Sequence, residues 1–224
     1  MTAHLHTKDD TRTLDELRLA LAPAIADAAV FDGWGEEAVA EAAMAEGVDP
    51  AVAEFAFPGG AMDMIAAWIA RIDADMAQAL PTSTLAALPV RERIRQLVEF
   101  RLNAVAGSRE AVRRALTIMA LPKNLARAAQ LGWGSADAMW RAAGDTATDF
   151  NHYTKRLTLA GIYTATLAVF VNDDSEGFAE TRAFLDRRIA GIMRFEKAKA
   201  RFLSPKDEGF SMTRLLGRLR YPAT

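Results

Sequence analysis

Few residues of this sequence could carry out chemistry. Its 224 residues include no cysteine and three histidines, so thiolate nucleophiles, disulfides and cysteine-ligated metal centres are excluded. His4 and His6 fall in an opening segment that we interpret as a disordered arm, which leaves His152. A Gly-x-Ser-x-Gly elbow, a phosphate-binding loop and a dinucleotide fingerprint are all missing from the sequence. We therefore expect a protein that is not an enzyme.

The spacing of Asp149 and His152 is the nearest approach to a metal-ligand pattern. Di-iron helical bundles use a Glu-x-x-His on each of two helices together with two further glutamates. This sequence has a single imperfect copy. Thr148 and Asp149 fit better as capping residues at the start of a helix. The sequence predicts no metal site and no cofactor.

Helices must position these residues, because apolar residues recur at helical spacing and convincing strand patterns are missing. Residues 81–89 read as a loop and 204–209 as a hinge. The apolar run between Arg156 and Asp173 is shorter than the roughly 20 residues that cross a bilayer. We therefore predict an all-α fold class. Because we expect no leader in the opening residues, we also expect the protein to be cytoplasmic. The predicted helices cover residues 14–30, 36–46, 50–57, 62–80, 90–106, 109–121, 123–131, 135–143, 148–171, a segment ending near 202, and 210–221.

The three short N-terminal helices have the layout of a TetR-type helix-turn-helix. Its charge is wrong for DNA, because no Lys or Arg occurs between Arg18 and Arg71. DNA affinity depends on cations that neutralise phosphates. We therefore predict a degenerate helix-turn-helix that does not bind nucleic acid. The acidic residues of this segment are Asp27, Asp32, Glu36, Glu37, Glu41, Glu46, Asp49, Glu54 and Asp63.

Four motifs in a fixed order resemble one family. They are FDGW at 31–34, AFPGG at 56–60, MWRAAGDTATDFNHYTKR at 139–156 and FLDRRI at 184–189. Together they are similar to the Coq-nine family of ubiquinone-biosynthesis accessory proteins, over roughly residues 14–200. The segment 145–156 is the most specific part. The family pattern has a tryptophan where this chain has His152. Because of this departure, the resemblance does not identify which residues form the partner surface.

The resemblance implies a TetR-like helical bundle that binds an isoprenoid lipid or quinone intermediate and presents it to a ubiquinone-pathway hydroxylase. It also implies a C-terminal amphipathic helix that touches the membrane, which places the protein peripherally on the inner face of the cytoplasmic membrane. By analogy with TetR-like bodies, we expect a homodimer formed through residues 148–171 and 178–199. A ligand-sensing regulator and a structural interaction protein without lipid cargo are the alternatives.

Large apolar residues at helical spacing are candidates for lining a lipid pocket. For any one of them the ordinary core is the default interpretation, and the family resemblance favours a pocket only for the set as a whole. The candidate lipid-binding residues are Ile65, Trp68, Phe100, Leu116, Met119, Trp140, Leu159, Tyr163, Leu167 and Phe170.

A second set of candidates lies in the segment most specific to the family. These residues could form a salt-bridged network that fixes a turn, a docking surface for the partner, or both. The candidate partner-binding residues are Asp145, Asp149, Asn151, His152, Tyr153 and Arg156.

The C-terminal segment mixes apolar and basic residues, a pattern that suits an anionic bilayer surface. The alternative is a helix that packs on the body or on a dimer mate. The candidate membrane-binding residues are Phe210, Arg214, Leu215, Leu216, Arg218, Leu219 and Arg220.

We predict four segments for the chain. They are a disordered arm at 1–12, the degenerate helix-turn-helix lobe at 13–60, the lipid-binding and dimerisation body at 61–202, and the hinge with its membrane helix at 203–224.

Overall fold

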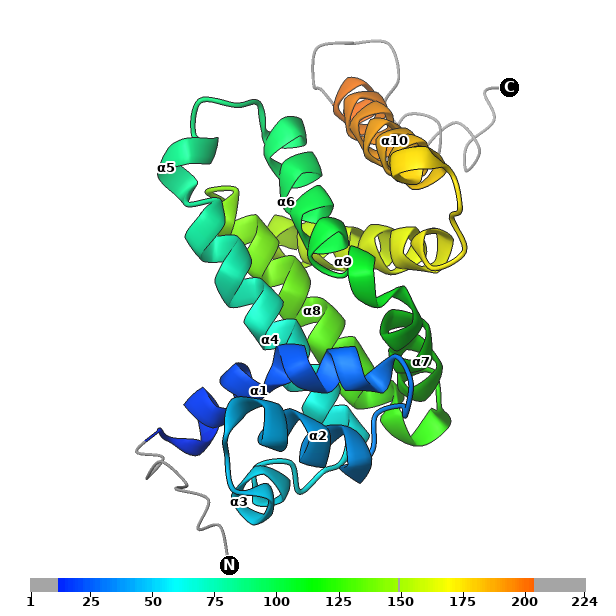
Figure 1. The fold of residues 1–224 in the computed structure, drawn as a ribbon. Helices are drawn as coiled ribbons and strands as arrows, with labels where there is room; N and C mark the ends of the chain where they lie inside the picture. The colour runs from blue at the N-terminus through cyan, green and yellow to red at the C-terminus, as the bar shows by residue number, and fades with distance from the viewer. Residues whose placement is uncertain (1–11, 149, 204–224) are drawn as a thin grey trace, which may run out of the picture. The chain divides into compact units, whose positions relative to one another are not determined.

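The computed structural model describes residues 12–148 and 150–203, with Phe150 and residues 192–203 described as backbone only. All regular structure in this range is helical (Figure 1), which confirms the predicted all-α class. Short 3-10 turns follow α6, α7 and α9. The helices are α1 (Leu14–Ala29), α2 (Glu36–Glu46), α3 (Pro50–Phe55), α4 (Ala61–Ala79), α5 (Thr82–Leu85), α6 (Val90–Ala104), α7 (Arg109–Met119), α8 (Leu125–Ala142), α9 (Phe150–Phe170) and α10 (Ala179–Leu203).

Two compact units divide the chain, one up to Asp186 and the other from Arg187 onward. The cavity and side-chain clusters that matter for function all lie in the first unit.

Local signals explain the N-terminal lobe, which consists of α1 to α3. Thr13 and Glu16 form a reciprocal capping box at the start of α1. Gly47 ends α2 with φ of 68°, in the left-handed region that favours glycine. The side chain of Asp49 then accepts a hydrogen bond from the backbone N–H of Ala51 and begins α3. These turns fold α2 and α3 back against α1.

Trp34 attaches the lobe to the body. Its indole Nε1 donates a hydrogen bond to the carbonyl oxygen of Ala111 in α7 at 3.0 Å. Its ring lies 5.3 Å from the ring of Trp68 in α4, measured between centroids. A buried tryptophan needs such a hydrogen-bond partner for its N–H. Through these two contacts Trp34 connects the N-terminal lobe to α4 and α7, which lie far from it in the sequence.

The body is built from α4, α6, α7, α8 and α9. Helix α8 packs against α4 and α9, and α6 packs against the same two helices. Fully buried residues such as Leu97 of α6 and Met139 of α8 fill the core between them. Each helix therefore contributes one face to a shared interior.

One predicted break is wrong. The segment Gly132-Trp133-Gly134 was expected to separate two short helices, but α8 runs continuously from Leu125 to Ala142. A glycine inside a helix costs about 1 kcal/mol relative to alanine. Burial of Ser135, Ala136 and Met139 in the body offsets that cost. The predicted loop at 81–89 also contains the short helix α5.

Asp173 fixes the connection between α9 and α10. Its buried carboxylate accepts hydrogen bonds from the backbone N–H groups of Ser175 at 2.9 Å and Thr181 at 2.8 Å, and from both hydroxyls. Burial alone would raise the pKa of Asp173, but these hydrogen bonds outweigh it and hold the pKa well below its ordinary value. The carboxylate is therefore ionised and caps the start of α10.

Replacing Asp173 by alanine should lower the free energy of unfolding by about 1–3 kcal/mol at neutral pH, because buried donors lose their acceptor. The carboxylate's contribution is present above its unfolded-state pKa of about 3.9 and disappears as the pH falls through the lowered folded-state pKa. Urea unfolding of wild type and Asp173→Ala across the acidic range measures both effects.

The matched control is Asp174→Ala, which removes the adjacent exposed carboxylate and should change the stability by less than about 0.5 kcal/mol. Equal losses in the two variants would contradict the assigned role of Asp173.

Candidate functional site: an apolar cavity crossed by a buried ion pair

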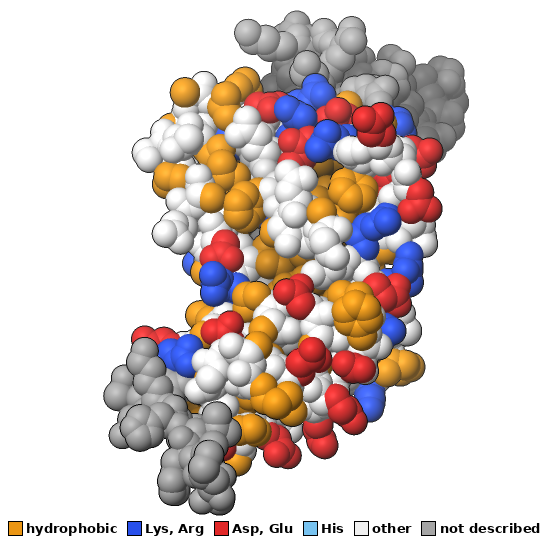
Figure 2. All heavy atoms as spheres, viewed as in Figure 1, with side chains coloured by type: hydrophobic (Ala, Val, Ile, Leu, Met, Phe, Trp, Pro, Cys, Tyr) orange, Lys and Arg blue, Asp and Glu red, His pale blue; other side chains and the backbone are white. Residues whose placement is uncertain are grey.

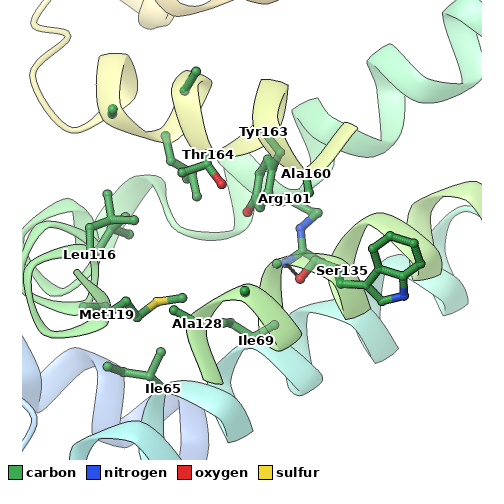
Figure 3. Close-up of a pocket in the computed structure, with 18 of the residues that line it drawn as sticks. Ile65, Ile69, Arg101, Leu116, Met119, Ala128, Ser135, Ala160, Tyr163 and Thr164 are labelled. Atoms are coloured by element: carbon green, nitrogen blue, oxygen red, sulfur yellow. Dashed lines mark hydrogen bonds between the residues drawn. The ribbon is translucent and has the colours of Figure 1, made fainter. Parts of the chain in front are cut away.

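A cavity of about 720 Å³ lies among α4, α6, α7, α8 and α9. This is within the usual range for small-molecule sites, roughly 300–1,000 Å³. Figure 3 shows Ile65, Leu116 and Met119 on one side of it. Arg101 is the single charged side chain among the described residues that line the cavity. The site is thus a largely apolar chamber with one ionic feature.

Six of the ten predicted lipid-binding residues line this cavity: Ile65, Trp68, Leu116, Met119, Tyr163 and Leu167.

The other four lie elsewhere. Leu159 and Phe170 are buried in the core, and the ring of Phe170 packs on Phe178 at 4.8 Å between centroids. Phe100 is half-buried on α6. The indole of Trp140 donates its hydrogen bond to the carbonyl oxygen of Lys155 at 3.0 Å. Helical spacing marks an apolar face, but it does not tell a cavity wall from ordinary core.

Small residues create the space, and the sequence analysis did not single them out. Figure 3 shows Ala128 of α8 across the cavity from Ala160 and Thr164 of α9. Gly132 of α8 and Gly161 of α9 also line the cavity. A Cβ atom added at Gly132 or Gly161 would meet no other atom within 4 Å. The available signal was the four-residue spacing of small side chains on both helices.

The cavity opens to solvent between α8 and α9. Leu125 and Leu157 line it, yet they are 54% and 69% exposed. Trp133 also lines it, and its ring centroid lies 6.0 Å from that of Tyr153. Tyr153 and Leu157 are four residues apart, so they share one face of α9. An aromatic cluster therefore borders the mouth of the cavity.

Arg101 connects four helices. It forms an ion pair with Asp73 of α4, and its Nη2 donates a hydrogen bond to the hydroxyl of Ser135 in α8 at 3.1 Å. Its guanidinium carbon lies 4.9 Å from the ring centroid of Tyr163 in α9. Burial disfavours the cation, but Tyr163 and Asp73 outweigh it and hold the pKa of Arg101 above its ordinary value. Arg101 is therefore a buried, paired cation.

The sequence carried a signal for Arg101 that pattern reading missed. Arg101 follows Ile94, Leu97 and Val98 at intervals of seven, four and three residues, so it occupies the apolar stripe of α6. A charge on a buried stripe must find a partner in the interior.

The predicted partner-binding residues include a tight charge network at the turn between α8 and α9. Arg156 donates to Asp137 at 2.6 Å and to Asp145 at 3.0 Å, and Lys155 donates to Asp145 at 2.6 Å. Burial raises the pKa of Asp145, but the bonds from Lys155 and Arg156 outweigh it and hold the pKa below its ordinary value. Sequence reasoning missed Asp137 and Lys155.

The remaining predicted partner residues surround this network. His152 lies beside Tyr153, with 5.1 Å between ring centroids, and its Nδ1 is 3.0 Å from the carbonyl oxygen of Ala147. Asn151 is exposed on α9. Asp149 lies outside the described residues. The structure thus brings His152 and Tyr153 to the mouth of the cavity, with Arg156 and Asp145 buried behind them.

The surface of the first unit carries uneven charge. Figure 2 shows acidic side chains gathered over the N-terminal lobe.

In the part of the chain that the structure describes, no cluster of three or more His, Cys, Asp or Glu residues could hold a metal ion. None of the described helices is long and apolar enough to cross a membrane. The predicted membrane-binding residues, Phe210 to Arg220, fall beyond the described residues.

The sequence pattern of one family, COQ9, matches residues 125–196, which include α8 and α9. The ubiquinone biosynthesis protein COQ9 of Rattus norvegicus is 36% identical over 72% of this chain and 54% of its own length. The proteins of the same name from Bos taurus and Homo sapiens are 32% and 31% identical over 83% of this chain and 60% of theirs. The chain belongs to the COQ9 family.

This COQ9-family chain spans a little over half the length of the curated relatives it matches. Its motifs at 139–156, on which the resemblance mainly rested, lie inside the matched region. The resemblance inferred from the sequence is therefore confirmed.

The fold has a counterpart among solved structures. A TetR transcriptional regulator from Nitrosomonas europaea superposes with a TM-score of 0.61 and 23% sequence identity, over 78% of this chain and 97% of the regulator. At this identity the likeness concerns the fold alone, and it confirms the predicted TetR-like architecture.

Arg156→Ala should lower the free energy of unfolding by about 3–5 kcal/mol, because two carboxylates would lose their buried cation. Arg141→Ala is the matched control, since Arg141 pairs with the same Asp137. The side chain of Arg141 is 70% exposed, against 2% for Arg156, so its loss should cost less than about 1 kcal/mol. Urea unfolding measures both, and similar losses would refute the structural role of Arg156.

Proposed function

We propose that this protein is a non-catalytic accessory protein of ubiquinone biosynthesis that holds an isoprenoid lipid or quinone intermediate in its cavity. The observation that carries the proposal is the 720 Å³ apolar chamber whose open mouth lies beside Trp133 and Tyr153. The relatives' names, which are those of ubiquinone biosynthesis proteins, support the same pathway.

The cavity lining suits a chain of hydrocarbon. Its walls are aliphatic, aromatic and small side chains, with Arg101, Ser135, Tyr163 and Thr164 as polar exceptions. Apolar surface removed from water favours binding by about 25 cal/mol per Å². A lipid that fills this space would gain its affinity mainly from the tail.

The mouth of the cavity supports presentation to a second protein. Tyr153 is exposed, and its ring contacts both His152 and the cavity-lining Trp133. Aromatic side chains are enriched where proteins bind one another. The ion pairs of Arg156 stabilise the start of α9, so this surface has a fixed geometry. A pathway hydroxylase docked here would meet the ligand as it emerges.

The membrane role rests on the sequence beyond residue 203, where Arg214, Arg218 and Arg220 alternate with apolar residues. We propose that this segment binds an anionic bilayer surface reversibly, at the inner face of the cytoplasmic membrane. The relatives are named as mitochondrial proteins, so in them the corresponding membrane would be a mitochondrial one. A homodimer formed through residues 148–171 and 178–199 also stays a prediction.

Filling the cavity should remove the ligand. Gly132→Phe places a ring in the cavity from α8, where a Cβ meets no atom within 4 Å. Gly134→Phe is the matched control on the same helix, because Gly134 is exposed and lies outside the cavity lining. Neither variant should be destabilised, since glycine is the weaker helix former.

Mass spectrometry of organic extracts from the purified proteins decides the result. Wild type and Gly134→Phe should carry an isoprenoid or quinone that Gly132→Phe lacks. Equal extracts from all three, or an empty wild-type extract, would count against the cavity as the binding site.

Removing the C-terminal cations should abolish membrane binding. Each basic residue near an anionic surface contributes about 1 kcal/mol, so R214E/R218E/R220E should weaken binding by at least about a hundredfold. Co-sedimentation with phosphatidylglycerol vesicles measures this, and phosphatidylcholine vesicles serve as the uncharged control. The deletion of residues 204–224 should behave alike, and unchanged sedimentation of both variants would refute the anchor.

A further inference from the structure

The interior of the cavity offers little to a polar headgroup. Arg101 is the single charged side chain among the described lining residues, and it is 1% exposed. Its guanidinium already binds Asp73 and Ser135. Figure 3 shows it between Ser135 and Tyr163, against whose ring it packs. Thr164 is on the exposed side of α9. Because a polar group buried without a partner is unfavourable, an amphiphilic ligand is most stable with its chain inside and its headgroup at the mouth.

The mouth of the cavity offers aromatic surface instead. Trp133 of α8 lines the cavity and is partly exposed. The centroid of its ring lies 6.0 Å from that of Tyr153, with an angle of 34° between the two planes, and 6.4 Å from that of His152. Tyr153 is 60% exposed, so a molecule at the mouth can contact its ring. We call Trp133, His152 and Tyr153 the aromatic rim.

A planar ring is the headgroup that suits the aromatic rim. Aromatic rings prefer tilted or offset contacts with centroids about 4.5–7 Å apart, and such pairs stabilise a contact beyond the apolar area that they bury. The rings of the rim already pack on one another in this way. A ligand ring would extend the cluster, whereas an alcohol or an acyl headgroup would gain no such contact.

Charge indicates that the ring is neutral. Lys155 and Arg156 follow the rim residues on α9, and both are paired with Asp145. Arg156 also pairs with Asp137. These two positive charges are therefore matched within the protein, and they are not left over for an anionic headgroup. Uncharged rings such as quinones and phenols need no counter-ion.

We propose that the aromatic rim is a headgroup subsite, in which the uncharged planar ring of an isoprenoid quinone or phenol stacks on Trp133 and Tyr153 while its chain occupies the cavity. This inference rests on the proposed lipid-binding function. It adds an orientation, with the ring outward, and a selection for ring-bearing lipids over isoprenoid alcohols and acyl lipids.

Two probes with the same chain test the selection: geranyl-1,4-benzoquinone and geranylcyclohexane-1,4-dione. Both carry two carbonyl oxygens, but only the quinone ring is flat and unsaturated. The chain has no cysteine, so the quinone forms no thiol adduct. Titration calorimetry measures the affinity of the purified protein for each probe. The quinone should bind at least about fivefold more tightly than the saturated dione, as expected for stacking on two aromatic side chains.

Tyr153→Leu tests the assigned rim, because leucine keeps an apolar side chain but lacks the ring. This variant should lower the ratio of the two affinities by at least about twofold, and W133L/Y153L should bring it close to one. Phe55→Leu is the matched control, because Phe55 is an aromatic side chain of α3 that is 70% exposed and lies outside the cavity lining. It should retain the wild-type ratio. If W133L/Y153L does not fold, Tyr153→Leu decides alone, since substitutions of exposed side chains change stability little.

The outcomes separate the two proposals. If neither probe binds, the lipid-binding function fails, and the subsite with it. If both probes bind with equal affinity, the aromatic subsite is refuted while the lipid cavity stands. A preference for the quinone that is unchanged in Tyr153→Leu and W133L/Y153L places the ring elsewhere and refutes the role of the rim.

Discussion

The ion pair between Arg101 and Asp73 holds together the helices that surround the cavity. Helix α6 supplies the guanidinium, α4 the carboxylate, α8 the hydroxyl of Ser135 and α9 the ring of Tyr163. A hollow interior forfeits much of the dispersion energy and apolar burial that a close-packed core provides. Directional contacts from one side chain to three neighbouring helices compensate for part of that loss and keep the walls apart at a defined distance.

A second buried arginine performs a similar task for the two cavity-lining helices α8 and α9. Arg156 ties the start of α9 to the last turns of α8 through Asp137, and to the intervening turn through Asp145. Arg101 and Arg156 thus fix α8 at neighbouring positions, Ser135 and Asp137, and fix α9 near its start and at Tyr163. Small residues elsewhere on the two helices, such as Gly132 and Ala160, line the open space. Large side chains at the positions of these small residues would fill the cavity. Alanines and glycines alone, without the two arginines, would not fix the position of α8 relative to α9. The combination of ionic clamps and small residues is what permits a stable cavity.

The helical architecture was largely predictable because its signals are local. Thr13, Asp49 and the left-handed Gly47 mark helix ends through interactions within a few residues. The break expected at Gly132 to Gly134 was wrong because tertiary packing of α8 overrides the weak preference of glycine. The absence of phosphate-neutralising residues between Arg18 and Arg71 could likewise be read directly from the sequence.

The cavity could be predicted only in part. Large residues such as Met119 and Tyr163 were identified, but the space itself depends on what Gly132, Ala160 and Gly161 lack, and periodicity does not report missing atoms. The partners of Arg101 lie on three other helices, so their identity depends on tertiary packing. Its place on the apolar stripe of α6 was nevertheless visible, and it signalled that a partner must exist.

The acidic lobe has a consequence for how the molecule approaches charged surfaces. With no Lys or Arg between residues 19 and 70 and nine carboxylates in that span, the lobe is repelled by any anionic bilayer or polyanion within a Debye length, about 8 Å at physiological ionic strength. Encounters that bring α2 and α3 to such a surface are therefore disfavoured. Added salt weakens this repulsion, so ionic strength would control how strongly this lobe is kept away from a negatively charged surface.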